Sequence, residues 1–550
     1  MRAMILVLLI LPFFSKAQVA LEKYWIQFSD KDNTPYSIAQ PESFLSPRAI
    51  ARRERQGIAL TLRDLPVDPE YIAQVRATGA EVLSVSKWMN AITFRTIDNA
   101  VLQQVLALPF VVNSMPVGKQ KSAASEWSKW DEIAVAKSLE VPIKDADYGT
   151  AFNQIDMLGG VLLHQQNLMG QGMMIAVLDG GFSSADQLSV FDSLRQNGRL
   201  VGTWDIVGRN SNVYGYSSHG TAVLSTMAAY QQGVMIGTAP KASYLLIRTE
   251  DVDSEFPVEE DYWIAGAEYA DSAGADIINS SLGYTTFDDP FYDHSYADMN
   301  GQTTHGARAA NMAAAAGILV VNSAGNSGNN PWKYIGTPAD ADSALAIGAV
   351  NATREYASFS SIGPSSDGRV KPNVCAQGQL AIVAGTLGGV GPSNGTSFSG
   401  PIMAGMAACL WQSNPIATNM QVFESIERSA HIYSAPTAQL GYGIPYFPKA
   451  RVVLAGYNPT NLEQDELLTA FPNPFTSELK GAFFSAINQD LEFQLVNSMG
   501  QQVQIIKGVG CETCVHEFRF TGLNSLQAGT YYIYATSKEG KFHSKMIKVD

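Results

Sequence analysis

The fold is decided by a short stretch, Met174-Ile-Ala-Val-Leu-Asp179, in which apolar residues run directly into an acidic one. A continuous apolar run of this length is typical of a strand that is buried on both faces. Similar runs recur at Tyr244–Ile247, Ile277–Asn279, Ile318–Val321 and Leu345–Ile347. Helical patterns lie between and after them, at His219–Tyr230, Glu259–Ala273, His305–Ala316 and Ser397–Gln412. Strands that alternate with helices predict an α/β domain over residues 148–457, built on a parallel sheet with helices on both faces.

The bulk composition describes a globular protein of several domains. The chain has 550 residues, of which 46% are hydrophobic and 16% charged. This length predicts two to four domains. A formal net charge of −14 argues against nucleic acid as a partner. Four cysteines are too few for a disulfide framework to hold the main domain together.

Smaller units are predicted on both sides of the α/β domain. Residues 18–118 mix short strands with amphipathic helices, which indicates a small α+β unit. Residues 119–147 lose this periodicity and predict a polar linker that contains a maturation site. A second linker, 458–466, leads to alternating apolar and polar runs over 467–550. That pattern predicts a small all-β sandwich.

The first residues have the pattern of a secretory signal peptide. Arg2 supplies the positive charge, Ile5 to Phe14 the apolar core, and Ser15-Lys-Ala17 the cleavage pattern. The alternative is a buried N-terminal helix. A signal peptide over 1–17 predicts a secreted protein, extracellular or on the cell surface after it has passed through the periplasm.

Three polar residues in the main domain form a candidate catalytic group. In chain order they are Asp179, His219 in His219-Gly-Thr-Ala222, and Ser397. A serine hydroxyl becomes nucleophilic when a histidine removes its proton, and an aspartate fixes the tautomer of that histidine. His219 and Ser397 each open a predicted helix, whose first N–H groups then face the reacting centre. Pro401 is expected in the first turn of the second helix, where a missing N–H costs little.

The segments around these three residues resemble the motifs of the subtilase family of serine endopeptidases. The aspartate motif is Ala176-Val-Leu-Asp-Gly-Gly-Phe182, in which Gly-Gly replaces the commoner Thr/Ser-Gly, and the serine motif is Gly395-Thr-Ser-Phe-Ser-Gly-Pro401. The resemblance implies a subtilisin-like fold. It also implies hydrolysis of peptide bonds in proteins through an acyl-enzyme on Ser397, with no cofactor required.

Two further segments resemble the same family. Val320-Val-Asn-Ser-Ala-Gly-Asn326 is similar to the strand that delivers the oxyanion-hole asparagine, so the resemblance implies that role for Asn326. Ser280-Ser-Leu-Gly283 is similar to the segment that pairs with the substrate backbone. The implied substrate-binding residues are Ser281, Leu282, Gly283, Ala324 and Gly325.

The flanking units also carry resemblances. Residues 18–117 look like the inhibitory propeptide of subtilases, which implies a self-processed zymogen with its own propeptide as inhibitor. Residues 467–550, with Phe471-Pro-Asn-Pro-Phe475 and Gly529-Thr-Tyr-Tyr-Ile533, resemble the C-terminal sorting domain of type IX secretion. That would make the secretion machinery a partner of a protein that we expect to be a monomer. The alternative for this unit is a substrate- or carbohydrate-binding module.

Other interpretations stay open at this stage. The chain could be a binding protein on a subtilase scaffold that has lost catalysis. The acidic residues Asp288, Asp289, Asp293 and Asp298 could bind structural calcium, although a solvated acidic loop explains them as well and no metal site is assigned. Cys511-Glu-Thr-Cys514 could form a local disulfide or a metal half-site, although no second pair completes a zinc ligand set, so a short disulfide is expected. Outside the candidate site, the histidines are expected to be surface or capping residues: His164, His294, His305, His431, His516 and His543.

Overall fold

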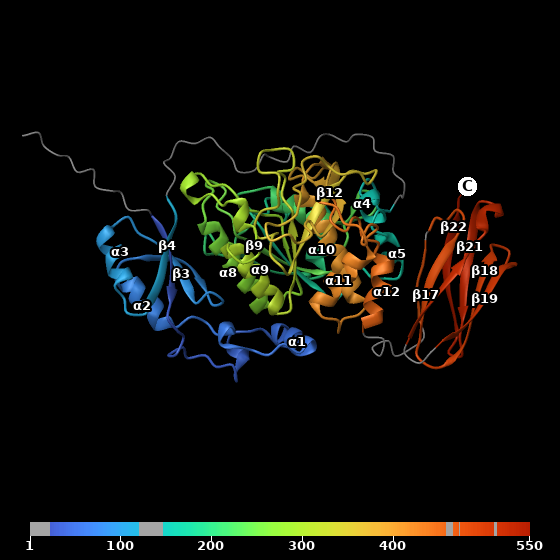
Figure 1. The fold of residues 1–550 in the computed structure, drawn as a ribbon, viewed down its shortest axis with the longest axis horizontal. Helices are drawn as coiled ribbons and strands as arrows, with labels where there is room; N and C mark the ends of the chain where they lie inside the picture. The colour runs from blue at the N-terminus through green and yellow to red at the C-terminus, as the bar shows by residue number, and fades with distance from the viewer. Residues whose placement is uncertain (1–21, 120–146, 458–465, 472, 511–513, 550) are drawn as a thin grey trace, which may run out of the picture.

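The computed structural model describes residues 22–119, 147–457, 466–471, 473–510 and 514–549. The predicted signal peptide, and most of the two predicted linkers, lie outside the described residues. Figure 1 shows three units in a row: an N-terminal unit in blue, a central domain from teal to orange, and a C-terminal unit in red. The predicted boundaries between these units remain predictions.

The N-terminal unit is a four-stranded antiparallel sheet with two helices packed on it. Its strand order is β2-β3-β1-β4. Apolar side chains such as Ile26, Phe94 and Val105 form its core. The elements are β1 (Lys23–Phe28), α2 (Pro69–Ala77), β2 (Glu81–Ser86), β3 (Ala91–Arg95), α3 (Asn99–Leu106) and β4 (Val111–Gly118). The α+β prediction is confirmed for this unit.

A long connection leaves this sheet between β1 and α2. We call residues 29–66 the arm. The arm holds one α-helix, α1 (Pro47–Gln56), which has Ser46 as its N-cap and Gly57, where φ is +67°, as its C-cap. In Figure 1 the arm runs beneath the central domain, and α1 contacts the helix α8 (Val258–Ala273) there.

The central domain is built on a seven-stranded sheet whose strand pairs are all parallel. The strand order is β13-β12-β11-β10-β5-β9-β6. These strands are β5 (Met174–Asp179), β6 (Leu200–Asp205), β9 (Ser243–Arg248), β10 (Ile277–Ser280), β11 (Leu319–Ser323), β12 (Ala344–Val350) and β13 (Val374–Gln377). This is the α/β fold on a parallel sheet that the sequence predicted.

Helices cover both faces of this sheet. Side chains of β5 alternate between two cores: Ile175 and Val177 join one, and Ala176 and Leu178 the other. The first core is closed by α7 (His219–Ala228), α10 (Thr396–Gln412), α11 (Asn419–Ser429) and α12 (Phe447–Tyr457). The second core is closed by α8 and α9 (His305–Ala315). Short elements complete the domain: α4 (Phe152–Asp156), α5 (Gly160–Gln165), α6 (Asp192–Gln196), β7 (Tyr230–Gln231), β8 (Met235–Ile236), β14 (Ala381–Ala384) and β15 (Val390–Ser393).

The C-terminal unit is a sandwich of two antiparallel sheets, as the sequence predicted. The sheets have the orders β16-β17-β20 and β19-β18-β21-β22. Phenylalanines such as Phe483, Phe493 and Phe518 fill the space between them. Its strands are β16 (Glu466–Phe471), β17 (Leu479–Ser485), β18 (Gln489–Asn497), β19 (Gln502–Gly510), β20 (Cys514–Phe520), β21 (Gly529–Thr536) and β22 (Lys541–Lys548). The sandwich contacts α12 through β16 and β20.

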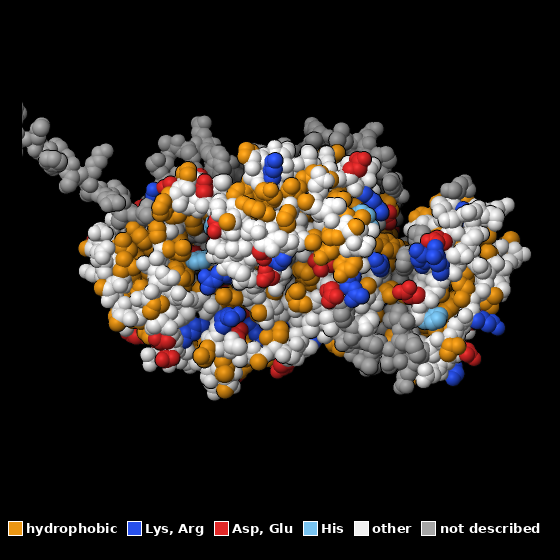
Figure 2. Space-filling view, viewed as in Figure 1, with side chains coloured by type: hydrophobic (Ala, Val, Ile, Leu, Met, Phe, Trp, Pro, Cys, Tyr) orange, Lys and Arg blue, Asp and Glu red, His pale blue; other side chains and the backbone are white. Residues whose placement is uncertain are grey.

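The surface carries charges of both signs. On the face shown in Figure 2, acidic and basic side chains lie in small groups among hydrophobic ones. Within the described ranges, no helix is both long enough and apolar enough to cross a membrane.

Candidate active site

The candidate site lies at the carboxyl end of the parallel sheet. Asp179 is the last residue of β5 and is fully buried. Its Oδ1 accepts a hydrogen bond from the N–H of Gly180 at 2.8 Å, and its carbonyl accepts one from Thr249 at 3.0 Å. The carboxylate is therefore fixed by the strand and by the loop that follows β9.

His219 lies directly against this carboxylate. It is the first residue of α7, and its Nδ1 is 2.9 Å from Oδ1 and 3.0 Å from Oδ2 of Asp179. A carboxylate only accepts, so Nδ1 carries the proton and Nε2 is left as the acceptor. Gly220 makes this approach possible, because a Cβ there would lie 2.3 Å from the carbonyl oxygen of Gly181 and 3.0 Å from Cβ of Asp179.

Ser397 is the second residue of α10 and is 6% exposed. The ring of Phe398, the next residue, lies 6.2 Å from the His219 ring between centroids. Gly395 precedes the helix with φ +155°, a conformation that glycine adopts readily and other residues rarely do. The N-terminus of α10 therefore brings the candidate nucleophile to the same edge of the sheet as the histidine and the aspartate.

Pro401 is not in the first turn of α10, as the sequence suggested, but is its sixth residue. An α-helical N–H at that position would bond to the carbonyl of Ser397, and proline has none. The hydroxyl of Ser281 donates to that carbonyl instead, at 3.0 Å. The structure thus gives the side chain of Ser281 a contact to the serine helix, a role that the sequence analysis missed.

Asn326 lies three residues after β11 and contacts the start of α10. Its Oδ1 accepts from the N–H of Thr396 at 2.9 Å and from its hydroxyl at 3.0 Å. The N–H of Gly325 donates to the same hydroxyl at 3.2 Å. With Oδ1 engaged by Thr396, the amide is oriented and its Nδ2 is left as the donor end.

The five expected substrate-binding residues follow two neighbouring strands. Ser281, Leu282 and Gly283 come after β10, and Ala324 and Gly325 after its partner β11. The carbonyl of Leu282 accepts from Asn322 Nδ2 at 3.0 Å, and the N–H of Ala324 bonds to Ile347 at 2.9 Å. These segments flank the serine helix, and several of their polar groups, including the Ser281 hydroxyl and the Gly325 N–H, already bond within the domain.

The histidine interpretation was wrong for three residues. His164 is buried, with Nδ1 3.0 Å from the Tyr148 hydroxyl and Nε2 2.9 Å from the carbonyl oxygen of Thr238. Burial lowers its pKa to about 4. His294 and His305 are mostly buried beside acids of α8, at 2.7 Å from Glu260 and 3.0 Å from Asp261 respectively. A sequence pattern could not show these pairs, because their members lie more than 30 residues apart.

The acidic loop uses its carboxylates to hold backbone turns. Asp289 accepts from the N–H of Phe291, and Asp293 from that of Phe287 at 2.7 Å. Asp298 closes a capping box with Ser295. Within the part of the chain that the structure describes, no group of three or more His, Cys, Asp or Glu side chains is arranged to hold a metal ion.

The cysteines of the central domain are free and buried. Burial raises the pKa of Cys375 to about 12 and that of Cys409 further still. Both thiols are therefore protonated at neutral pH and play no part in the candidate site. Cys511 lies outside the described residues, so the expected Cys511/Cys514 disulfide remains a prediction.

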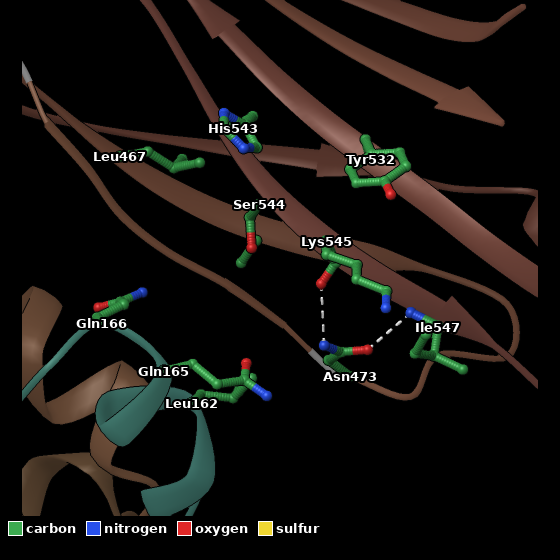
Figure 3. Close-up of a pocket in the computed structure, with 11 residues that line it drawn as sticks. Leu162, Gln165, Gln166, Leu467, Asn473, Tyr532, His543, Ser544, Lys545 and Ile547 are labelled. Atoms are coloured by element: carbon green, nitrogen blue, oxygen red, sulfur yellow. Dashed lines mark hydrogen bonds between the residues drawn. The ribbon is translucent and has the colours of Figure 1, made fainter. Parts of the chain in front are cut away.

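A cavity of about 580 Å³ lies elsewhere, between the central domain and the C-terminal sandwich. Figure 3 shows Leu162 and Gln165 of α5 on one side, and Tyr532 and His543 of the sandwich on the other. Asn473 joins this region to β22, since it donates to the carbonyl of Lys545 and accepts from the N–H of Ile547. The cavity contains none of the candidate catalytic residues.

Comparison with known proteins identifies the family. Residues 170–457 match the model of the subtilase family, and residues 23–130 match the Peptidase S8 propeptide domain of Bacteroidota. Subtilisin NAT of Bacillus subtilis subsp. natto is 32% identical over 314 residues, which cover 56% of this chain and 71% of that protein. A subtilisin of Bacillus pumilus is 32% identical over 279 residues, which cover 50% and 90%. The chain belongs to the subtilase family.

It follows that the protein is a subtilisin-like serine endopeptidase with a propeptide domain, and hence a zymogen. Its substrates are proteins, and its own propeptide is its inhibitor. Among solved structures, MycP1 from Mycobacterium smegmatis has a TM-score of 0.45 and 22% identity to this chain, over 56% of this chain and 86% of that one.

Proposed function

We propose that Asp179, His219 and Ser397 form the catalytic triad of this endopeptidase. The observation that carries the proposal is the contact of His219 Nδ1 with both oxygens of Asp179, at 2.9 and 3.0 Å, beside the helix that begins with Thr396 and Ser397. In this arrangement His219 Nε2 takes the proton of the Ser397 hydroxyl as it attacks the peptide carbonyl. The same nitrogen then returns the proton to the leaving amine. Water then attacks the acyl-enzyme with His219 again as the base, and the peptide acid leaves Ser397 with its proton restored.

We further propose that Asn326 and the Ser397 backbone N–H stabilise the oxyanion of the tetrahedral intermediate. The hydrogen bonds from Thr396 to Asn326 Oδ1 support this role, because they leave the amide nitrogen as the donor. Segments 281–283 and 324–325 then bind the substrate backbone on either side of the serine helix. Replacing Asn326 by Ala is expected to lower kcat by about a hundredfold to a thousandfold with little change in KM.

A serine-directed probe tests the triad. Wild-type protein should react with a fluorophosphonate at Ser397 and hydrolyse casein, whereas Ser397→Ala should do neither and should keep its propeptide attached. Ser399→Ala, two residues further along the same helix, is the matched control. Casein hydrolysis by Ser397→Ala at the wild-type rate would refute the assignment.

We propose that the C-terminal sandwich directs export through type IX secretion, and that the protein acts outside the cell as a monomer. The two-sheet architecture and the Pro-Asn-Pro entry at residues 472–474 support this proposal. Deleting residues 467–550 should leave an active enzyme in the cell envelope. Normal export of the truncated protein, together with loss of binding to an insoluble substrate, would favour a binding module instead.

A further inference from the structure

The arm contacts the central domain near the amino ends of the parallel strands. The candidate catalytic residues lie at the opposite, carboxyl ends. Asp276, which the arm contacts, exchanges hydrogen bonds with Met174 at the beginning of β5, while Asp179 ends the same strand. A strand rises about 3.3 Å per residue, so these ends lie about 17 Å apart. The arm therefore does not block the cleft, and its extensive contacts require another explanation.

Arg52 of α1 joins the carboxyl ends of two helices. Its side chain is fully buried, and it donates to the carbonyls of Ala275 at 2.6 Å and Ala316 at 3.2 Å, which follow α8 and α9. It also pairs with Asp271 in the last turn of α8. A cation is favoured there, because the carbonyls at the end of a helix have no helical partners and carry partial negative charge.

Asp271 is surrounded by three cations, all from the N-terminal unit. Besides Arg52, Arg53 approaches it to 2.9 Å and Lys87 to 2.8 Å, and Asp271 itself is fully buried. Burial alone would raise the pKa of Asp271, but these cations hold it well below its usual value. The carboxylate is thus ionised while the arm is docked, and the arm provides most of its charge partners.

More peripheral contacts extend the same surface. Arg48 and Arg55 flank Asp276, with Arg55 at 3.0 Å, and Arg48 also donates to the carbonyl of Gly172 at 2.7 Å. Gln56 bonds to the carbonyl of Gly317 at 2.8 Å and accepts from the N–H of Asn419 at 2.9 Å. One short helix thereby contacts four separate segments of the central domain: Gly172, residues 271–276, residues 316–317 and Asn419.

We propose that the arm is an anchor that keeps the propeptide bound after the segment joining it to the enzyme has been cut. The arm docks on a guanidinium-binding site at the carboxyl ends of α8 and α9. The helix α1 occupies this site, first as part of the intact chain and later as part of the severed propeptide. The proposal rests on removal of the N-terminal unit during activation. It adds that release of the propeptide is limited by the arginines of α1 as well as by the other contacts of the N-terminal unit, such as those of Ser86 and Lys87 with Glu268.

The test measures how long a severed propeptide stays bound. A full-length Ser397→Ala chain, which does not process itself, receives a recognition sequence for an added site-specific protease within residues 120–146. After cleavage, dissociation of the propeptide is followed by gel filtration and intact mass. A propeptide that carries Arg52→Ala is expected to dissociate at least tenfold faster than the unmodified propeptide. A propeptide that carries Arg76→Ala, at an exposed arginine of α2, should dissociate at the unmodified rate.

Equal dissociation rates for Arg52→Ala and the unmodified arm would overturn the proposal. If Arg52→Ala does not fold, Arg55→Ala replaces it, because that side chain is 29% exposed and its ion pair is peripheral. The propeptide with Arg55→Ala should dissociate about threefold faster than the unmodified propeptide. An unchanged rate would again overturn the proposal. The dissociation assay uses the inactive Ser397→Ala chain, so its result does not depend on catalysis. Failure of the catalytic assignment would be seen in a separate assay, as inactivity of the wild-type chain.

Discussion

At the residue scale, Pro401 explains why a hydroxyl from a distant loop bonds to the helix that carries Ser397. The proline removes the N–H that would otherwise bond to the carbonyl of Ser397, and Ser281 replaces it. The sequence contained the signal, a proline four residues after the candidate nucleophile. It could not say which group would fill the gap, because Ser281 lies 116 residues earlier.

A double-mutant cycle tests this positioning role. Ser281→Ala should lower kcat about tenfold with little change in KM, because the buried carbonyl of Ser397 loses the donor that replaces the helical N–H, and the start of α10 shifts. In a Pro401→Ala background the helix regains its own N–H, so the same substitution should cost much less. Equal losses in both backgrounds, measured from kcat and KM on a peptide substrate, would contradict the role.

At the element scale, α5 is joined to the loop before β9 through His164. Its hydrogen bonds to Tyr148 and to the carbonyl of Thr238 are those of a neutral ring. Its folded-state pKa of about 4 is below the unfolded value of about 6.5, so the unfolded chain binds the extra proton first as pH falls. The stability contributed by this histidine is therefore complete above pH 6.5 and is lost between pH 6.5 and pH 4.

The effect of His164 is measurable as a pH-dependent loss of stability. Between pH 7 and pH 5 the group should cost about 2 kcal/mol of unfolding free energy. Urea unfolding of the Ser397→Ala chain at both values measures this loss, and His164→Gln should reduce the difference by about that amount. His431→Gln, at an exposed position, is the control. An unchanged pH dependence in His164→Gln would contradict the expectation.

The elements that the sequence revealed are those whose pattern is local. Continuous apolar runs placed β5, β9, β10, β11 and β12, and put Asp179 at the end of its strand. The edge strand β6 was missed because Leu200–Asp205 mixes polar with apolar residues and is half-exposed. The helix α2 gives only a weak signal in the sequence, because Pro69–Ala77 buries only Val75 and so lacks a strong apolar face.

The docking of α1 shows why other features escaped sequence reasoning. Four arginines within Pro47–Gln56 have the pattern of a solvated helix face. Arg52 and Arg53 are buried beside Asp271, which meets them from a helix more than 200 residues further along the chain. The partner of a buried charge is set by the tertiary fold. Sequence motifs and hydrophobic periodicity therefore could not predict this site.

At the scale of the whole molecule, α8 is the element on which the propeptide rests. Glu268 in its third turn accepts hydrogen bonds from Ser86, Lys87 and Trp88, and Asp271 lies one turn further on, among the arm's cations. Loss of the N-terminal unit should therefore loosen the end of α8 and leave the sheet beneath it unchanged.

Hydrogen exchange checks this expectation. In the cut Ser397→Ala chain, amides of residues 270–275 should exchange at least tenfold faster once the propeptide has been separated, because the side chains that bind that turn have gone. Amides of β5 serve as the internal control and should keep their rates. Uniform acceleration throughout the central domain would show global destabilisation instead of a local effect.

The guanidinium-binding surface also has a pharmacological consequence. A compound that competes with α1 for Asp271 and Asp276 would speed release of the cut propeptide without entering the cleft. In a screen for inhibitors it would register as an activator, since it would shorten the delay before proteolysis begins. Drug-like cations directed at this acidic site would thus speed activation of the zymogen, and their potency would follow their affinity for a surface about 17 Å from the candidate catalytic aspartate.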